Sequence, residues 1–168
     1  QHLLDIYVKR NDSFRSPFLN DVQLEKQFLS EFPYDDTPDQ VSAWEDLSSD
    51  LSSSSPMDRL LCGDVGFGKT ELAIRASFRV VLSKKRVVVL APTTILASQL
   101  YSSFASRLEK NAVSVDMVSR FRSKGELVKI KKCVLEEKND VLVGTHALLN
   151  DPIYINNIGL LIVDEEHK

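Results

Sequence analysis

The sequence has few cysteines, no long apolar run and no excess of basic residues, and each absence excludes a class of protein. Cys62 and Cys133 are the only cysteines in 168 residues, and no Cys-x-x-Cys spacing occurs. A disulfide framework or a zinc site is therefore not expected, and a cytoplasmic, reducing location fits. No apolar stretch approaches the roughly 20 residues of a membrane-spanning helix, so we expect no membrane partner.

Charge and composition are those of an ordinary folded chain. The 21 Lys and Arg residues against 24 Asp and Glu residues give a formal net charge of −3, so bulk attraction to nucleic acid is not expected, although a local basic cluster would still allow binding. The length predicts about one compact domain. Because the sequence starts at Gln1 without a signal-peptide pattern and stops directly after an acidic cluster, we expect an internal piece of a longer protein.

The apolar pattern predicts a lead-in followed by one domain. Residues 1–32 are expected to form a short helical lead-in, whose second helix starts at about Asp21. Residues 33–168 are expected to form the domain. Near its start, Thr37-Pro38-Asp39-Gln40 has the pattern of a helix N-terminus with a capping box and a proline at the first helical position.

Strands and helices are predicted to alternate after Pro56. The expected helices cover residues 69–82, 94–110 and 124–137, and the expected strands cover residues 59–62, 86–91, 113–118, 140–144 and 159–164. Alternation of this kind requires crossover connections, so the sequence predicts an α/β fold with a mostly parallel sheet between helices.

Residues 63–70 read G-D-V-G-F-G-K-T and fit the phosphate-binding loop G-x-x-x-x-G-K-[ST]. The loop lies between a predicted strand and a predicted helix, the context that this motif requires. Its backbone N–H groups and the helix N-terminus would hold phosphate oxygens. Lys69 would meet the β- and γ-phosphates, and the hydroxyl of Thr70 would bind Mg²⁺. A fortuitous glycine-rich turn is the alternative.

A second pattern, L-L-I-V-D-E-E-H at residues 160–167, places carboxylates at the end of an apolar strand. Ligands bind at that end of the strands in open α/β sheets. Asp164 would hold Mg²⁺, through water, and Glu165 would orient and deprotonate the attacking water. A solvated acidic turn is the alternative for this segment taken alone. Together the two patterns predict a P-loop NTPase that uses a nucleoside triphosphate and Mg²⁺, and the helicase resemblance described next implies that the nucleotide is ATP.

The D-E-E-H tail resembles motif II of superfamily 2 helicases, and other helicase motifs follow in chain order. Gln40 stands where the glutamine motif would read adenine, which is compatible with its capping role. Residues 91–94 (A-P-T-T) and 143–146 (V-G-T-H) resemble motifs that contact nucleic acid. A small-molecule phosphotransferase and a nucleotide-switched interaction module remain as alternatives from other functional classes.

The resemblance is closest to the bacterial transcription-repair coupling factors. The segments that carry it are residues 32–34, 37–40, 62–71, 119–123, 144–146 and 160–167. The related RecG-type fork-remodelling helicases share the G-D-V-G loop, but a serine is usual in them at the position of Phe67. Lys168 stands where the coupling factors usually have Arg.

This resemblance implies a RecA-like motor lobe, truncated after the acidic-box strand. The parent protein would move along double-stranded DNA, displace stalled RNA polymerase and recruit excision-repair proteins, through domains and a second RecA-like lobe outside these residues. The implied nucleotide-binding residues are Phe32, Gln40, Gly63, Asp64, Val65, Gly66, Phe67, Gly68, Lys69, Thr70 and Glu71. The implied DNA-binding residues are Thr94, Arg120, Arg122, Thr145 and His146. Residues 1–168 alone are expected to be inactive as an ATPase.

Overall fold

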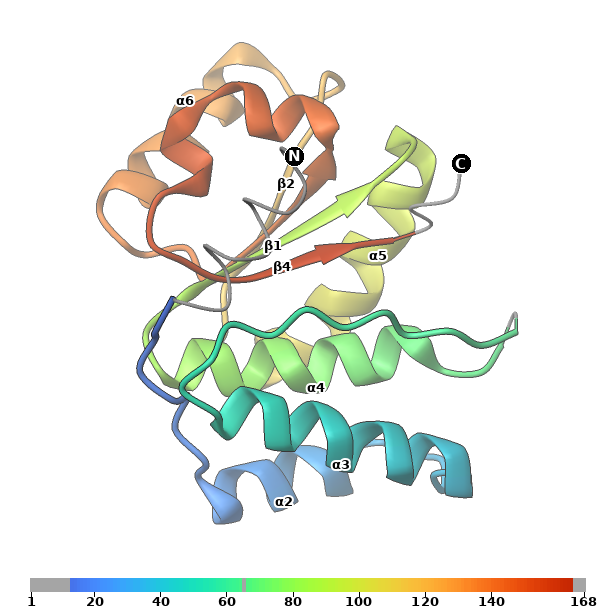
Figure 1. The fold of residues 1–168 in the computed structure, drawn as a ribbon. Coiled ribbons are helices and arrows are strands. Elements are labelled where there is room, and N and C mark those ends of the chain that lie inside the picture. The colour runs from blue at the N-terminus through green and yellow to red at the C-terminus, as the bar shows by residue number, and fades with distance from the viewer. Residues whose placement is uncertain (1–12, 65, 165–168) are drawn as a thin grey trace, which may run out of the picture. The chain divides into compact units, whose positions relative to one another are not determined.

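The computed structural model of the chain describes residues 13–64 and 66–164 (Figure 1). The chain divides into two compact units, one that ends at Leu72 and one that begins at Ala73. This division falls within helix α4 (Lys69–Leu82). The predicted boundary between residues 32 and 33 stays a prediction, and the helix predicted near the N-terminus lies outside the described residues. Each unit is described by itself.

The first unit contains helices α2 (Val22–Ser30) and α3 (Pro38–Ser52). Asp21 caps α2 by accepting from the N–H groups of Gln23 and Leu24 at 3.1 and 3.0 Å. Thr37 caps α3 with the reciprocal bonds of a capping box, and Pro38 occupies the first helical turn. These side-chain acceptors satisfy N–H groups that have no partner within the helix. Both helix starts therefore confirm the sequence prediction.

The segment that precedes α2 is attached to the C-terminal end of α3. Phe18 is buried, and its N–H donates to the carbonyl of Leu51 at 3.1 Å. The Arg15 guanidinium donates to the carbonyls of Asp50 and Leu51 at 2.7 and 3.1 Å. A cation is favourable at a helix C-terminus, where backbone carbonyls lack intrahelical donors.

The buried strand predicted at residues 59–62 is wrong. These residues adopt no regular secondary structure, and Leu60 is 77% exposed. A strand needs backbone partners on a neighbouring strand, and none of the strands found among the described residues pairs with this segment. Arg59 instead forms ion pairs with Asp46 and Asp50 on α3, at 2.9 and 2.6 Å.

The second unit is built on a four-stranded sheet with the order β2-β3-β1-β4. The strands are β1 (Arg86–Ala91), β2 (Val115–Val118), β3 (Val141–Thr145) and β4 (Ile158–Val163), and every neighbouring pair is parallel. All six residues of β1 are buried, as expected for a central strand between two helical layers. The predicted mostly parallel α/β sheet is confirmed.

Helices cover both faces of this sheet (Figure 1). On one face, Val88 and Leu90 of β1 join a buried cluster with Ile130 and Val134 of α6 (Lys124–Leu135). Successive strand residues point to opposite faces, so Val87 and Val89 point to the other face. There α5 (Thr94–Leu108) packs against β1, β2 and β3.

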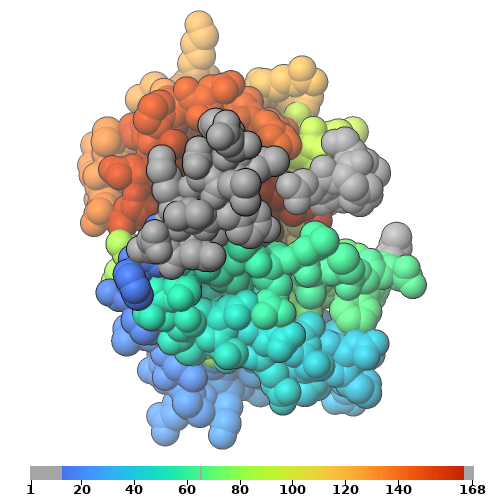
Figure 2. All heavy atoms as spheres, viewed as in Figure 1, coloured from blue at the N-terminus to red at the C-terminus, as the bar shows by residue number. Residues whose placement is uncertain are grey.

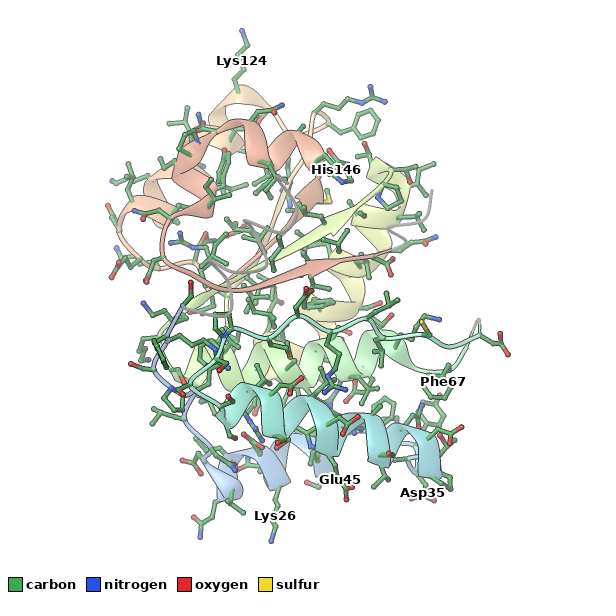
Figure 3. The ribbon with its side chains drawn as sticks, viewed as in Figure 1. Lys26, Asp35, Glu45, Phe67, Lys124 and His146 are labelled. Atoms are coloured by element: carbon green, nitrogen blue, oxygen red, sulfur yellow. The ribbon has the colours of Figure 1, made fainter. Side chains whose placement is uncertain are left out.

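Short 3-10 helices complete the connections of the second unit. η1 (Glu109–Asn111) follows α5, while η2 (His146–Asn150) and η3 (Pro152–Ile155) join β3 to β4. Lys124, at the start of α6, projects away from the second unit (Figure 3), and the space-filling view shows a narrow projection in the colour of this part of the chain (Figure 2). Among residues 13–64 and 66–164, no helix has the length and apolarity needed to cross a membrane.

Candidate nucleotide and nucleic-acid sites

The glycine-rich loop runs directly into the first turn of α4. A turn is closed where the N–H of Phe67 donates to the carbonyl of Asp64 at 3.1 Å. Gly66 and Gly68 have φ angles of 86° and 80°, a region that residues with a side chain rarely adopt. The helix begins at Lys69. The predicted helix directly after the loop is confirmed. The strand predicted before the loop, at residues 59–62, is absent.

Two of the loop glycines also leave space that neighbouring side chains fill. A Cβ atom at Gly63 would lie 2.7 Å from Cδ1 of the Phe67 ring. A Cβ atom at Gly68 would collide with Nε2 of Gln40. Backbone conformation therefore favours glycine at Gly66, close packing favours it at Gly63, and both reasons apply at Gly68.

Lys69 folds back over the loop that precedes it. Its Nζ donates to the carbonyls of Gly63 and Asp64 at 2.5 and 3.0 Å. The first N–H groups of α4 have no acceptor within the helix, and the helix dipole adds partial positive charge at the same end. A cation, N–H donors and the hydroxyl of Thr70 thus gather at one helix terminus, and this donor set suits a phosphate with its Mg²⁺ ion.

Gln40 connects the start of α3 to this loop. Its Oε1 accepts from the N–H of Thr37 at 2.8 Å, and its Nε2 donates to the carbonyl of Phe67 at 2.5 Å. The capping role of Gln40 is therefore confirmed. Each bond uses one of the two lone pairs of Oε1 or one of the two N–H donors of Nε2, so one acceptor position and one donor are left for an adenine edge. The role of Gln40 in adenine recognition stays a prediction.

An aromatic pair lies between α2 and α3. The ring centroids of Phe32 and Tyr34 are 5.4 Å apart, with an interplanar angle of 67°. Tyr34 is 73% exposed. Figure 3 shows Phe67 at the same end of the first unit as Asp35, the residue that follows Tyr34. This end of the unit carries the loop, Gln40 and an exposed aromatic ring.

The acidic segment begins at the carboxyl end of β4. The N–H of Asp164 donates to the carbonyl of Leu90 at 2.9 Å, which fixes the end of β4 beside β1. Asp164 is half-buried. Val65 and Glu165, named above for nucleotide binding and for catalysis, lie outside the described residues. Among the described residues, no group of three or more His, Cys, Asp and Glu side chains forms a metal-binding cluster.

The predicted DNA-binding residues follow three adjacent strands of the sheet. In the register of the sheet, Ala91 pairs with Thr145 and Val118 pairs with Gly144. Thr94 follows β1, Arg120 and Arg122 follow β2, and His146 follows β3 (Figure 3 labels His146). Parallel neighbours end at the same edge, so the structure places these residues along one edge of the second unit.

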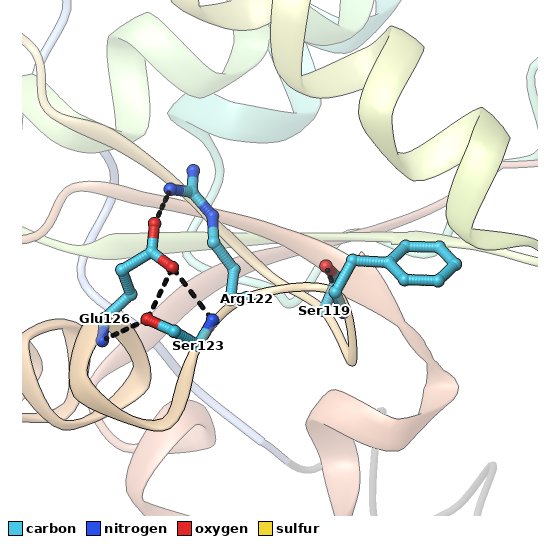
Figure 4. A network of polar contacts seen from close by, with 5 residues as sticks. Ser119, Arg122, Ser123 and Glu126 are labelled. Carbon is cyan, nitrogen blue, oxygen red and sulfur yellow. Dashed lines mark hydrogen bonds and ion pairs between the residues drawn. The ribbon is translucent and has the colours of Figure 1, made fainter.

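The connection between β2 and α6 is a tight turn anchored at both ends (Figure 4). The N–H of Arg122 donates to the carbonyl of Ser119 at 3.1 Å, and Ser119 is buried. Ser123 then begins α6 with a capping box that includes Glu126. Hydrogen bonds from Ser123, together with the Arg122 guanidinium, lower the pKa of Glu126 from 4.5 to about 2.

The two arginines of this turn differ in their surroundings. Arg122 forms an ion pair with Glu126 at 2.9 Å, and its guanidinium lies 6.0 Å from the centroid of the Tyr101 ring on α5. Arg120 is exposed, and its guanidinium lies 5.3 Å from the centroid of the Phe121 ring. Both arginines follow β2 within one short turn, so their sequence positions alone predict the same role for them. The capping-box spacing of Ser123 and Glu126 could have predicted the ion pair of Arg122 with Glu126, four residues away. No pattern in the sequence predicts the approach of Arg122 to Tyr101.

Comparison with known proteins identifies relatives of the whole chain. Residues 37–168 match the model of the DEAD/DEAH box helicase family. The transcription-repair-coupling factors of Escherichia coli strain K12 and Borreliella burgdorferi are 47% and 43% identical to the chain over 166 residues, which is 99% of the chain. The chain spans 14% and 15% of the length of these two relatives.

A solved structure has the same fold. The structure of RecG bound to a three-way DNA junction superposes with a TM-score of 0.89 at 32% sequence identity, covering 98% of this chain and 22% of that chain. The family model covers the glycine-rich loop and the parallel sheet, and the solved structure has the same fold as the chain. The chain belongs to the DEAD/DEAH box helicase family.

Proposed function

We propose that this chain is the ATP-binding lobe of a motor that moves along double-stranded DNA. In this proposal the intact protein displaces stalled RNA polymerase and couples transcription to nucleotide excision repair. The observation that carries the nucleotide part is the loop in which Gly66 and Gly68 adopt left-handed conformations and deliver Lys69 to the start of α4. The similarity to the transcription-repair-coupling factors supports the part of the proposal that concerns RNA polymerase and repair.

Each residue of the nucleotide site has a distinct task in this proposal. The Lys69 ammonium leaves the carbonyls of Gly63 and Asp64 and binds the β- and γ-phosphates, and the loop N–H groups hold their oxygens. Thr70 and Asp164 would hold Mg²⁺, which would supply charge neutralisation on the phosphates. Glu165 takes a proton from the attacking water. Gln40 and an aromatic ring, Phe32 or Tyr34, hold the adenine.

Hydrolysis in this proposal also needs a second lobe. An arginine that neutralises charge as the phosphoryl group transfers is commonly supplied by a separate element. The residues that would contact RNA polymerase and repair proteins likewise belong to parts of the parent protein outside residues 1–168. Membership of the DEAD/DEAH box helicase family supports ATP hydrolysis as the source of energy in this proposal.

DNA contact is assigned to the edge formed by the ends of β1, β2 and β3. Thr94, Arg120, Arg122, Thr145 and His146 would bind sugar and phosphate groups, because a motor must accept every sequence that it crosses. The exposed guanidinium of Arg120 is the cation best placed for a phosphate. The DNA-bound state of the RecG neighbour supports a nucleic-acid role for this fold.

The nucleotide assignment is tested by two variants of the intact protein. Lys69→Ala should abolish ATP turnover and weaken ATP binding without changing the fold, since Lys69 is not part of a core. Glu165→Gln should keep ATP binding and lose hydrolysis, because an amide cannot accept the proton. Undiminished ATPase activity in either variant would contradict the assignment.

A motor that remodels DNA forks is the second candidate, and the structural likeness to RecG on a three-way junction favours it. The higher sequence identity to the coupling factors, 47% against 32%, favours the first candidate. Fork reversal and release of stalled polymerase should be measured with the same intact protein. Fork reversal without polymerase release would select the second candidate.

A further inference from the structure

Both flanks of the glycine-rich loop are attached to the same helix, α3. After Gly66, Nε2 of Gln40 donates to the carbonyl of Phe67 at 2.5 Å. Before the loop, the Arg59 guanidinium donates to the carboxylates of Asp50 and Asp46 at 2.6 and 2.9 Å. Gln40 lies in the first turn of α3, and Asp50 lies in its last turn. The two ends of one helix thus hold the chain on both sides of the loop.

Burial and strand pairing do not fix the segment that contains Arg59. Residues 57–64 adopt no regular secondary structure, and residues 58–60 and 62–64 are exposed. None of the strands that the structure describes pairs with this segment. The ion pairs of Arg59 with α3 therefore contribute to where the chain lies, four residues before Gly63.

Asp50 is the main partner of Arg59, and a second arginine fixes its backbone. The hydrogen bond with Asp50 is the largest cause of the raised pKa of Arg59, so the guanidinium keeps its charge. The carbonyl of Asp50 accepts from Arg15 at 2.7 Å, and Arg15 also donates to the carbonyl of Leu51. The N–H of the buried Phe18 donates to the same Leu51 carbonyl. The end of α3 that receives Arg59 is therefore held by bonds that do not involve the Asp50 carboxylate.

We propose that Asp50 and Arg59 form a positioning pair for the glycine-rich loop, which places the loop N–H groups where nucleotide phosphates require them. The inference rests on the proposed function and adds a pair that acts on the loop rather than on the nucleotide. Hydrogen bonds from N–H groups to phosphate oxygens weaken steeply with poor distance and angle. A displaced loop would weaken the binding of every nucleoside triphosphate equally, because all of them share the phosphates. Gln40, in contrast, would distinguish one base from another.

The test is steady-state NTPase kinetics of the intact protein with ATP and with GTP. Both side chains of the pair are about one-third exposed. Arg59→Ala and Asp50→Ala should therefore each raise the KM for both nucleotides only about threefold, with little change in kcat. The double variant should lose no more than either single variant, because the two residues act as one pair. Exchanging the charges, with Asp50→Arg and Arg59→Asp in one protein, should recover part of the loss.

Three comparisons separate positioning from a general effect of charge. Loss of the Asp50 carboxylate would by charge alone favour an anionic nucleotide, so a raised KM in Asp50→Ala indicates displacement of the loop. The backbone bond from Arg15 remains in that variant. Glu45→Ala is the matched control, because it removes a negative charge from an exposed position on α3 and should not raise the KM (Figure 3 labels Glu45). The difference between the wild type and Arg59→Ala should shrink as the salt concentration rises.

The results that refute the pair differ from those that refute the proposed function. An unchanged KM in Arg59→Ala, with ATP turnover lost in Lys69→Ala, would leave the nucleotide site in place and refute the pair. Additive losses in the double variant, or a raised KM for ATP alone, would refute it as well. If a single variant unfolds, the charge-exchanged protein decides, and a restored fold without a restored KM counts against the pair. Undiminished turnover in Lys69→Ala would instead refute the proposed function.

Discussion

The side-chain amide of Gln40 bridges the first turn of α3 and the glycine-rich loop. Its Oε1 accepts from Thr37 at 2.8 Å, and its Nε2 donates to the carbonyl of Phe67 at 2.5 Å, one residue before Gly68. The residue proposed to recognise adenine is thus bonded to the loop proposed to hold the phosphates. A base that binds Gln40 would use the second N–H of Nε2 and the second lone pair of Oε1, while these two bonds hold the amide in place.

Gln40→Ala in the intact protein should raise the KM for ATP and weaken discrimination against GTP. Gln40→Glu is the matched variant, because its carboxylate can still accept from Thr37 but cannot donate to the carbonyl of Phe67. We expect Gln40→Glu to retain the start of α3 and to share the nucleotide defect. Steady-state kinetics with both nucleotides measure this. If the wild type uses ATP and GTP equally well, Gln40 is a helix cap alone.

Arg120 and Arg122 should contribute unequally to DNA binding. Arg120→Ala should weaken binding several-fold on all sequences, since the exposed guanidinium is available to a phosphate. Arg122→Ala should also weaken binding but lower the salt slope less, because Glu126 already balances part of its charge. Arg122→Lys serves as the control that keeps the charge. A larger slope change for Arg122→Ala than for Arg120→Ala would contradict this order.

The Glu126 carboxylate should make the start of α6 sensitive to acid. Its pKa is lowered from 4.5 to about 2, so its stabilising effect is fully present above pH 4.5 and is lost as the pH falls toward 2. Amide hydrogen exchange over residues 124–130 of the intact protein, corrected for intrinsic rates, should show this loss. Glu126→Gln should have lower protection at neutral pH and little further loss in acid. Equal pH profiles for the two proteins would refute the assignment.

A fragment of residues 1–168 should bind nucleotide weakly at most, and should show no meaningful ATPase activity. Among the described residues β4 has β1 as its single strand neighbour, and Leu161 and Val163 on β4 are 48% and 39% exposed. An open strand edge with apolar side chains favours association between chains. Sedimentation and ATP hydrolysis with and without duplex DNA test this. Robust DNA-stimulated turnover by a monomeric fragment would contradict it.

Local patterns in the sequence predicted most of the fold because their causes are local. The capping boxes at Thr37 and Ser123 depend on residues three apart, and the glycine-rich loop carries its own conformational requirement at Gly66 and Gly68. The strand predicted at residues 59–62 failed because an apolar run does not reveal whether a partner strand exists. The ion pairs that Arg59 forms with α3 depend on the path of this segment in space, which no spacing in the sequence encodes.

In the proposed function, ATP turnover at the glycine-rich loop drives movement along DNA. The most direct test is release of a stalled RNA polymerase from duplex DNA by the intact protein, with ATP supplied to the wild type and to Lys69→Ala. The proposal predicts ATP-dependent release by the wild type and none by the variant. Release without ATP, or equal release by Lys69→Ala, would contradict it.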